Sequence, residues 1–217
     1  MNYEAIPAFV VPVGVTQLDK TFCDPLKSLV PWNADIKEKD ETFVFNRLDD
    51  VPELKFRFLE IFSNYINQIL STPNQEWAMT SSWIIENTNG VALARHNHRN
   101  SYYSSVFYFS EVSEEHEPLR IESPINPPGF WVPEGEPNSF TGSDFIAPMT
   151  EGTIIFFPSY LYHYHNSYKA TTIPRKALTC NYIPIGKYGE GDSVLDTTKL
   201  HGSTNNTNTS NILDHNG

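Results

Sequence analysis

The hydrophobic pattern changes its period near Glu76, and this change constrains the fold more than any other feature of the sequence. Before it, the stretch VPELKFRFLEIFSNYINQIL (51–70) has apolar residues three and four positions apart, which predicts an amphipathic helix with Pro52 near its start. After it, short apolar stretches alternate with turns rich in Gly, Pro, Asn and Ser, which predicts strands. An opening strand is also predicted in AFVVPVGVTQL (8–18), at a sheet edge that tolerates Pro12.

The strands predicted after the helix are rich in β-branched and aromatic residues. They span 77–87, 104–112, 118–124, 152–165 and 175–185. A helical first part followed by many antiparallel strands is typical of a β-sandwich or jelly roll with helices packed on one face. We therefore predict a mainly β fold with packed helices.

The 217 residues are enough for one domain with a substantial core. We predict a single domain over residues 1–186, in which 1–75 form a helical and edge-strand support and 76–186 form the β core. Residues 187–217 are polar and poor in apolar side chains, so we expect a flexible tail without chemistry.

Charge and composition exclude several classes of partner. The net charge of −11 disfavours nucleic acid, because that binding depends on clustered Lys and Arg. No apolar run reaches the ~18–20 residues that a membrane-spanning helix needs, and the N-terminus lacks the pattern of a secretion signal. Cys23 and Cys180 are too few for a disulfide framework. We expect a cytoplasmic protein, in the host cytoplasm if it is viral, without nucleic-acid or membrane partners.

Two His-x-His pairs stand at the ends of predicted strands. His96 and His98 precede one strand. His163 and His165 end another. Residues two apart on a strand point to the same face, so each pair can aim two imidazole rings at one metal ion. A single histidine on a strand is more often an ordinary buried side chain, but two such pairs among seven histidines favour a metal site.

Arg175 stands twelve positions after His163, at the start of the stretch RKALTCNYIPI. A guanidinium inside a small β barrel needs an anionic partner, since burying it unpaired is costly, and its planar fork suits a carboxylate. Alone, an arginine beside Lys176 at a strand start is equally typical of the surface. Together with the histidines, it indicates an iron site beside a carboxylate-bearing cosubstrate.

The stretches WIIENTNGVALARHNHRNSYYSSVFYFSEV (83–112) and EGTIIFFPSYLYHYHNSYKATTIPRKALTCNYIP (151–184) resemble the core of the iron(II)- and 2-oxoglutarate-dependent oxygenases. The resemblance covers roughly Trp77 to Pro184 and is greatest to a phage and bacterial branch related to prolyl 4-hydroxylases. It rests on a Trp-led strand, His-x-His before a Ser-rich strand, and Phe-Pro-Ser before a distal His and a later Arg. It implies a double-stranded β-helix, a distorted jelly roll, with the metal at its open mouth.

The resemblance also implies iron(II) as cofactor, 2-oxoglutarate as cosubstrate, and a dioxygenase that hydroxylates a small molecule or a peptide, with prolyl peptides among the candidates. It implies His96 and His163 as metal ligands and Arg175 as the partner of the distal carboxylate of 2-oxoglutarate. His98 departs from the pattern, because the wider superfamily has Asp or Glu there. Either His98 is a third, neutral ligand, or it leaves this position to water or another anion.

Further residues follow from the same resemblance. Tyr102, Ser105 and Asn181 stand on strands that line the cosubstrate pocket, where they either bind 2-oxoglutarate oxygens or are ordinary barrel lining. His165 orients His163, lines the cavity or faces solvent. The stretch 126–145 is rich in Gly and Pro and too long for a tight turn, so it is a candidate lid or substrate loop.

Two other function classes stay open. A cupin-like dioxygenase with three His ligands and no organic cosubstrate explains His98 better, but it gives Arg175 no role. A jelly-roll binding module that holds a metal for stability predicts a closed, fully ligated site. Succinate formation that depends on both iron and 2-oxoglutarate separates the oxygenase from both.

Overall fold

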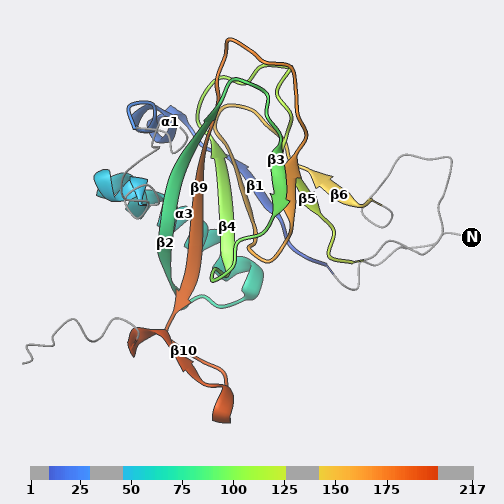
Figure 1. Cartoon of the computed structure of the whole chain (residues 1–217). Helices are drawn as coiled ribbons and strands as arrows, with labels where there is room; N and C mark the ends of the chain where they lie inside the picture. The colour runs from blue at the N-terminus through green and yellow to red at the C-terminus, as the bar shows by residue number, and fades with distance from the viewer. Residues whose placement is uncertain (1–9, 30–45, 126–141, 200–217) are drawn as a thin grey trace, which may run out of the picture.

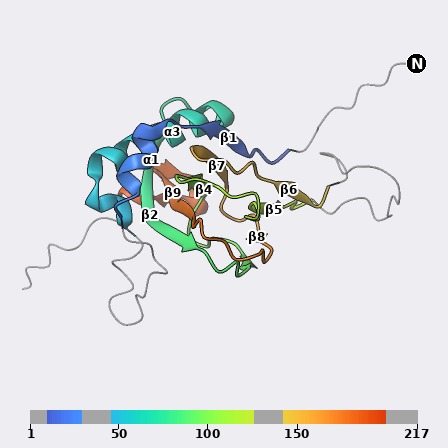
Figure 2. The ribbon, with the colours of Figure 1, turned by 90° about the horizontal axis from the view of Figure 1, so that it is seen from above.

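Two antiparallel sheets face each other, and helices cover the outer side of the larger sheet (Figures 1 and 2). The computed structural model describes residues 10–29, 46–125 and 142–199. The larger sheet has the order β1 (Gly14–Gln17), β7 (Thr153–Pro158), β4 (Tyr103–Tyr108), β9 (Arg175–Ile185) and β2 (Glu76–Asn87). The smaller sheet has the order β3 (Leu93–His96), β8 (His163–His165), β5 (Arg120–Glu122) and β6 (Asp144–Ile146).

Helix α3 (Pro52–Leu70) is the main support of the larger sheet, with α1 (Lys20–Leu26) and the short turn η1 (Arg47–Asp50) beside it. Proline suits the first turn of a helix, where its missing N–H leaves no bond unmade. The helix ends where Ser71 takes the left-handed conformation at φ 55°. Its buried residues recur every four positions, so they form one stripe that packs on the sheet. They are Leu54, Phe58, Phe62 and Ile66.

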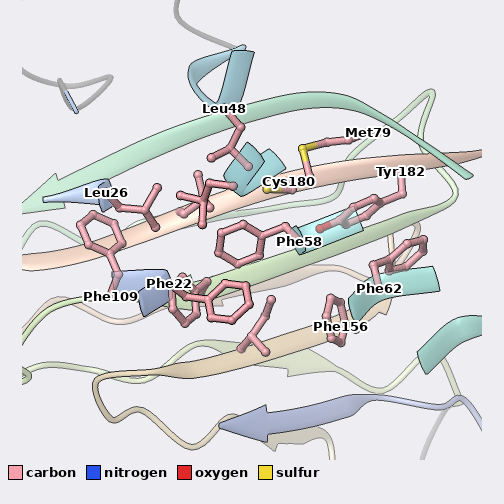
Figure 3. Packing of buried hydrophobic residues seen from close by; sticks show 14 of the residues in the cluster. Phe22, Leu26, Leu48, Phe58, Phe62, Met79, Phe109, Phe156, Cys180 and Tyr182 are labelled. Atoms are coloured by element: carbon pink, nitrogen blue, oxygen red, sulfur yellow. The ribbon is translucent and has the colours of Figure 1, made fainter. Parts of the chain in front are cut away.

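The core lies in two layers, one on each side of the larger sheet. The layer beneath the helices is rich in aromatic residues, and Figure 3 shows Phe58, Phe62 and Tyr182 within it. The layer between the sheets is formed largely by aliphatic residues. It contains Val106, Tyr108, Leu119, Ile121, Ala147, Ile155, Phe157, Leu161 and Ala177. Because β4 and β7 lie between these layers, every residue of both strands is buried.

The mainly β fold with packed helices is confirmed, and α3 matches the helix predicted over 51–70. The strand predicted over 152–165 is instead two strands, β7 and β8, which lie in different sheets. The chain turns after Pro158, which lacks the N–H that would continue the ladder. Of the strand predicted over 8–18, only Gly14–Gln17 form a strand in the described residues, as β1.

The described part of the predicted tail contains local structure. Strands β10 (Lys187–Tyr188) and β11 (Leu195–Asp196) pair with each other, and the turns η2 (Gly191–Ser193) and η3 (Thr197–Lys199) flank β11. Residues 200–217 lie outside the described ranges, and the division into a domain and a tail stays a prediction. No helix in the described ranges is both long and apolar enough to span a membrane.

Candidate metal centre

Three histidines meet on the inner side of the smaller sheet. His96, the last residue of β3, pairs with His163, the first residue of β8, and their ring centroids are 4.3 Å apart. His98 lies in the loop after β3, and its backbone N–H donates to the carbonyl oxygen of Ser159. Its ring centroid is 4.9 Å from that of His163 and 5.4 Å from that of His96. One nitrogen of each ring lies within 4.8 Å of the other two, as a shared metal requires.

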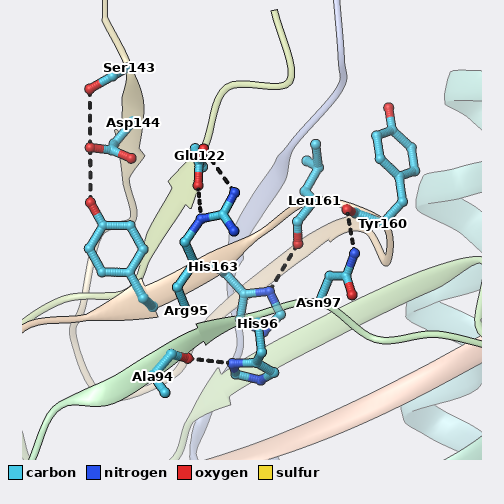
Figure 4. Close-up of polar contacts among 11 residues, drawn as sticks. Ala94, Arg95, His96, Asn97, Glu122, Ser143, Asp144, Tyr160, Leu161 and His163 are labelled. Carbon is cyan, nitrogen blue, oxygen red and sulfur yellow. Dashed lines mark hydrogen bonds and ion pairs between the residues drawn. The ribbon is translucent and has the colours of Figure 1, made fainter.

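Backbone carbonyls fix the rings of His96 and His163 (Figure 4). Nδ1 of His96 is 2.8 Å from the carbonyl oxygen of Ala94, and Nδ1 of His163 is 3.1 Å from that of Leu161. A carbonyl oxygen only accepts hydrogen bonds, so each Nδ1 carries the proton and donates it. Nε2 of both rings is therefore left with the lone pair that can bind a metal.

Side chains from two strands of the larger sheet hold the ring of His98. Its Nδ1 is 2.7 Å from Oδ1 of Asn181 in β9 and 2.9 Å from Oγ of Ser104 in β4. The ring of Trp83 covers another side, with centroids 5.4 Å apart. All three histidines thus have Nδ1 occupied by neighbouring oxygen atoms.

Burial favours the neutral form of two of the three rings, those of His98 and His163. Desolvation, together with the charges of His96 and His98, lowers the pKa of His163 to about 3. Desolvation likewise lowers the pKa of His98, against the opposing effect of its hydrogen bond to Asn181. At pH 7 these two rings are neutral, so a metal need not displace a proton from them. Three neutral imidazoles are a donor set that fits iron(II).

Arg175 is a buried cation with no anionic partner among the residues that the structure describes. Arg175 is only 4% exposed, and its Nη2 donates a hydrogen bond to the hydroxyl of Tyr108 at 3.2 Å. Nε has no hydrogen-bond partner, and the described residues give the guanidinium no carboxylate within 4.0 Å. Burying such a group is costly unless an anion pairs with it, so this part of the interior suits a carboxylate ligand.

His165 lies near Arg175 and does not face solvent, since only 3% of its surface is exposed. Its Nδ1 is 2.9 Å from the carbonyl oxygen of Asn166, and desolvation together with the charge of Arg175 lowers its pKa to about 4. It therefore adds a neutral ring to the wall near the arginine.

The other predicted cosubstrate residues lie in different places. Asn181 contacts His98. The hydroxyl of Ser105 lies 3.0 Å from that of Tyr182, in the layer beneath the helices, and the side chain of Tyr102 is exposed. We therefore leave Tyr102 and Ser105 out of the proposed cosubstrate site. Sequence reasoning missed Ser104, the neighbour that does face His98.

The candidate lid over 126–145 falls mostly on residues 126–141, which lie outside the described ranges. Its described end forms the start of β6, whose first residue, Asp144, accepts a hydrogen bond from Tyr164 (Figure 4 shows this carboxylate). The role of the segment as a lid stays a prediction.

Residues 81–181 match the profile of a protein family described as "Putative 2OG-Fe(II) oxygenase". The matched range includes the three clustered histidines and Arg175. This stretch is therefore similar to the 2OG-Fe(II) oxygenases. The predicted family is thereby confirmed, and no curated protein sequence matches the chain.

One of the solved structures that align with this chain also shows a similar fold, with a TM-score above 0.5. The non-heme alpha ketoglutarate dependent epimerase SnoN from nogalamycin biosynthesis aligns with a TM-score of 0.55 at 12% identity, over 83% of this chain and 82% of SnoN. A Pseudomonas putida prolyl-4-hydroxylase aligns with a TM-score of 0.45 at 13% identity, over 79% of this chain and 84% of that one. An oxidoreductase of the 2OG-Fe(II) oxygenase family from Burkholderia pseudomallei aligns at 14% identity with a TM-score of 0.40. The alignment covers 55% of this chain and 50% of that protein, so this chain spans about half of its length.

Proposed function

We propose that this chain is an iron(II)- and 2-oxoglutarate-dependent dioxygenase that hydroxylates a small molecule or a peptide. The observation that carries the proposal is that the chain has both a three-histidine cluster and a buried arginine that lacks an anion among the described residues. Either feature alone occurs in many folds. The family match over residues 81–181 supports the same reading.

His96, His98 and His163 would hold iron(II) through Nε2. When bound, iron supplies the activation of dioxygen that oxidises both 2-oxoglutarate and the substrate. The rings bring no negative charge, so the ion keeps its full double positive charge and attracts anions strongly. That charge favours a cosubstrate with two carboxylates.

Arg175 would bind the distal carboxylate of 2-oxoglutarate. The Tyr108 hydroxyl accepts a hydrogen bond from Arg175, which leaves its own proton free for the same carboxylate. Phe157 packs against the ring of His163, with centroids 5.0 Å apart, so this ligand has an apolar neighbour. A three-His dioxygenase without organic cosubstrate would leave Arg175 buried and unpaired, which favours the 2-oxoglutarate reading.

The activity test needs no known substrate. With iron(II), 2-oxoglutarate and oxygen, we expect the protein to form succinate and carbon dioxide above a metal-free control, because an open ligand position permits slow uncoupled turnover. Candidate prolyl peptides and free amino acids should accelerate succinate release for at least one class, measured by mass spectrometry. Silence from verified iron-loaded protein would favour the metal-stabilised binding module. Oxygen consumption without 2-oxoglutarate would favour the three-His dioxygenase.

A second prediction isolates the arginine. Replacing Arg175 by glutamine should weaken 2-oxoglutarate binding to the Co(II)-loaded protein by at least about 10-fold, the value of one good charge-assisted contact. Calorimetry without oxygen measures this binding, and Co(II) affinity should not change. Arg95→Gln is the control, because this exposed arginine pairs with Glu122 instead. Equal 2-oxoglutarate binding by the parent and Arg175→Gln would show that Arg175 serves only the fold.

A further inference from the structure

His98 is held differently from the other two histidines of the cluster. The rings of His96 and His163 each donate to a backbone carbonyl two residues earlier, so no side-chain change can remove those acceptors. His98 lies beyond the end of β3, and the oxygen atoms near its Nδ1 belong to side chains of other strands. Its orientation therefore depends on residues that substitution can alter.

The two side chains at Nδ1 of His98 are not equivalent. The carbonyl oxygen of Asn181 can only accept a hydrogen bond, whereas the hydroxyl of Ser104 can accept or donate. Ser104 donates to Oδ1 of Asn181 at 2.8 Å, and its Oγ lies 2.8 Å from that of Ser159. With its proton directed at Asn181, Ser104 can only accept from His98. Asn181 thus decides the direction of both hydrogen bonds.

The amide of Asn181 is itself anchored. Its Nδ2 donates to Oγ of Ser81 in β2 at 3.0 Å, so the carbonyl end is turned toward His98. Because Ser81 and Asn181 are partners in the β2–β9 ladder, the backbone sets this orientation as well. Strands β2, β4 and β9 thus jointly fix one carbonyl oxygen 2.7 Å from Nδ1 of His98.

We propose that Asn181 is a positioning residue for His98, whose side-chain carbonyl holds the proton on Nδ1 and so leaves Nε2 as the ligand atom. This inference rests on the proposed function for the metal. It assigns Asn181 to the metal centre and not to 2-oxoglutarate. Without the carbonyl, the Ser104 hydroxyl can rotate and donate to Nδ1, which moves the ring proton to Nε2 and blocks the ligand atom.

Nitrogen-15 NMR of histidine-labelled, metal-free protein reads the tautomer of His98 directly. The parent should carry the proton on Nδ1, and Asn181→Leu should shift it toward Nε2. Asn181→Asp keeps an acceptor at the same place and should retain the Nδ1–H tautomer, as should Ser104→Ala. An unchanged tautomer in Asn181→Leu, or a shifted one in Ser104→Ala, would overturn the proposal.

Anaerobic Co(II) titration, without 2-oxoglutarate, gives the second measurement. Asn181→Leu should bind Co(II) about 10- to 100-fold more weakly than the parent, the usual cost of losing the group that orients a ligand. Asn181→Asp should restore the affinity to within about threefold. If Asn181→Asp loses as much affinity as Asn181→Leu, the acceptor is not what matters and the proposal fails.

If Asn181→Leu does not fold, Asn181→Asp and Ser104→Ala still decide it. A parent that does not bind Co(II) would refute the proposed function, while NMR would still show whether Asn181 sets the tautomer.

Discussion

Replacing His163 by glutamine is expected to weaken metal binding by more than about 100-fold and to remove iron-dependent succinate formation. The loss should exceed the 10- to 100-fold typical of groups that only orient ligands, because His163 itself would supply a ligand atom. His163 is only 2% exposed, and its ring contacts the rings of both His96 and His98. The amide nitrogen of glutamine has no lone pair available for a metal, so it cannot replace the imidazole nitrogen. Anaerobic Co(II) titration and a succinate assay measure the two effects.

His116 provides the matched control for this prediction. It is also a buried histidine, but its Nδ1 accepts from the backbone of Ser113 and its Nε2 donates to the carbonyl oxygen of Ile173, away from the cluster. His116→Gln should therefore keep the Co(II) affinity of the parent, even if it lowers stability. Parent-like Co(II) affinity in His163→Gln would exclude His163 as a ligand.

The sequence was sufficient to bring the histidines into one prediction because strand geometry is local. Two His-x-His motifs at strand ends predict a metal site, and the structure adds the pairing of His96 with His163. His98 was placed on the same strand, whereas β3 ends at His96 and His98 lies in the following loop. Its inward direction comes from contacts with β4 and β9 and from the Ser159 carbonyl. Such long-range contacts leave no periodic signal.

The sequence does not show which of Ser104 and Ser105 faces the metal centre, for a related reason. Alternation identifies the inner face of a strand only when the other face meets water. Strand β4 is covered on one side by the helices and on the other by the smaller sheet, so all of its residues are buried. Ser104, Val106 and Tyr108 face the interior between the sheets, and the sequence gives them the same character as their neighbours.

The anion partner of Arg175 could be inferred only in outline. A guanidinium inside a β barrel needs an anion, which predicts a carboxylate partner, but this reasoning does not predict the contact with Tyr108. That contact joins β4 to β9, which are neighbours in the sheet and far apart in the chain. The prediction of Asn181 as a cosubstrate residue identified the correct interior face of β9. It could not identify the ring of His98 as its neighbour.

Replacing Phe62 by alanine is expected to lower the free energy of unfolding by about 3–5 kcal/mol, the usual cost of removing a buried phenylalanine ring. Phe62 is fully buried between α3 and the larger sheet. Its ring stacks on that of Tyr182 at 3.9 Å and meets the edge of Trp77 at 5.2 Å. Urea unfolding of the metal-free protein measures the loss. Phe56→Ala, on the exposed face of the same helix, should change stability by less than about 0.5 kcal/mol. Equal effects of the two changes would mean that α3 does not pack on the sheet as described.

The same variant links the core to the metal centre. Tyr182, on which Phe62 stacks, directly follows Asn181 in β9, and the two side chains lie on opposite faces of the sheet. A ligand that binds only the folded state stabilises it by about 2.7 kcal/mol at 100 times its dissociation constant. Co(II) should therefore restore much of the stability lost in Phe62→Ala, provided that the cluster still binds it. In the double variant with His163→Gln, Co(II) should restore almost none, because the gain requires the three-histidine cluster. Equal recovery in both proteins would place the stabilising metal somewhere other than this cluster.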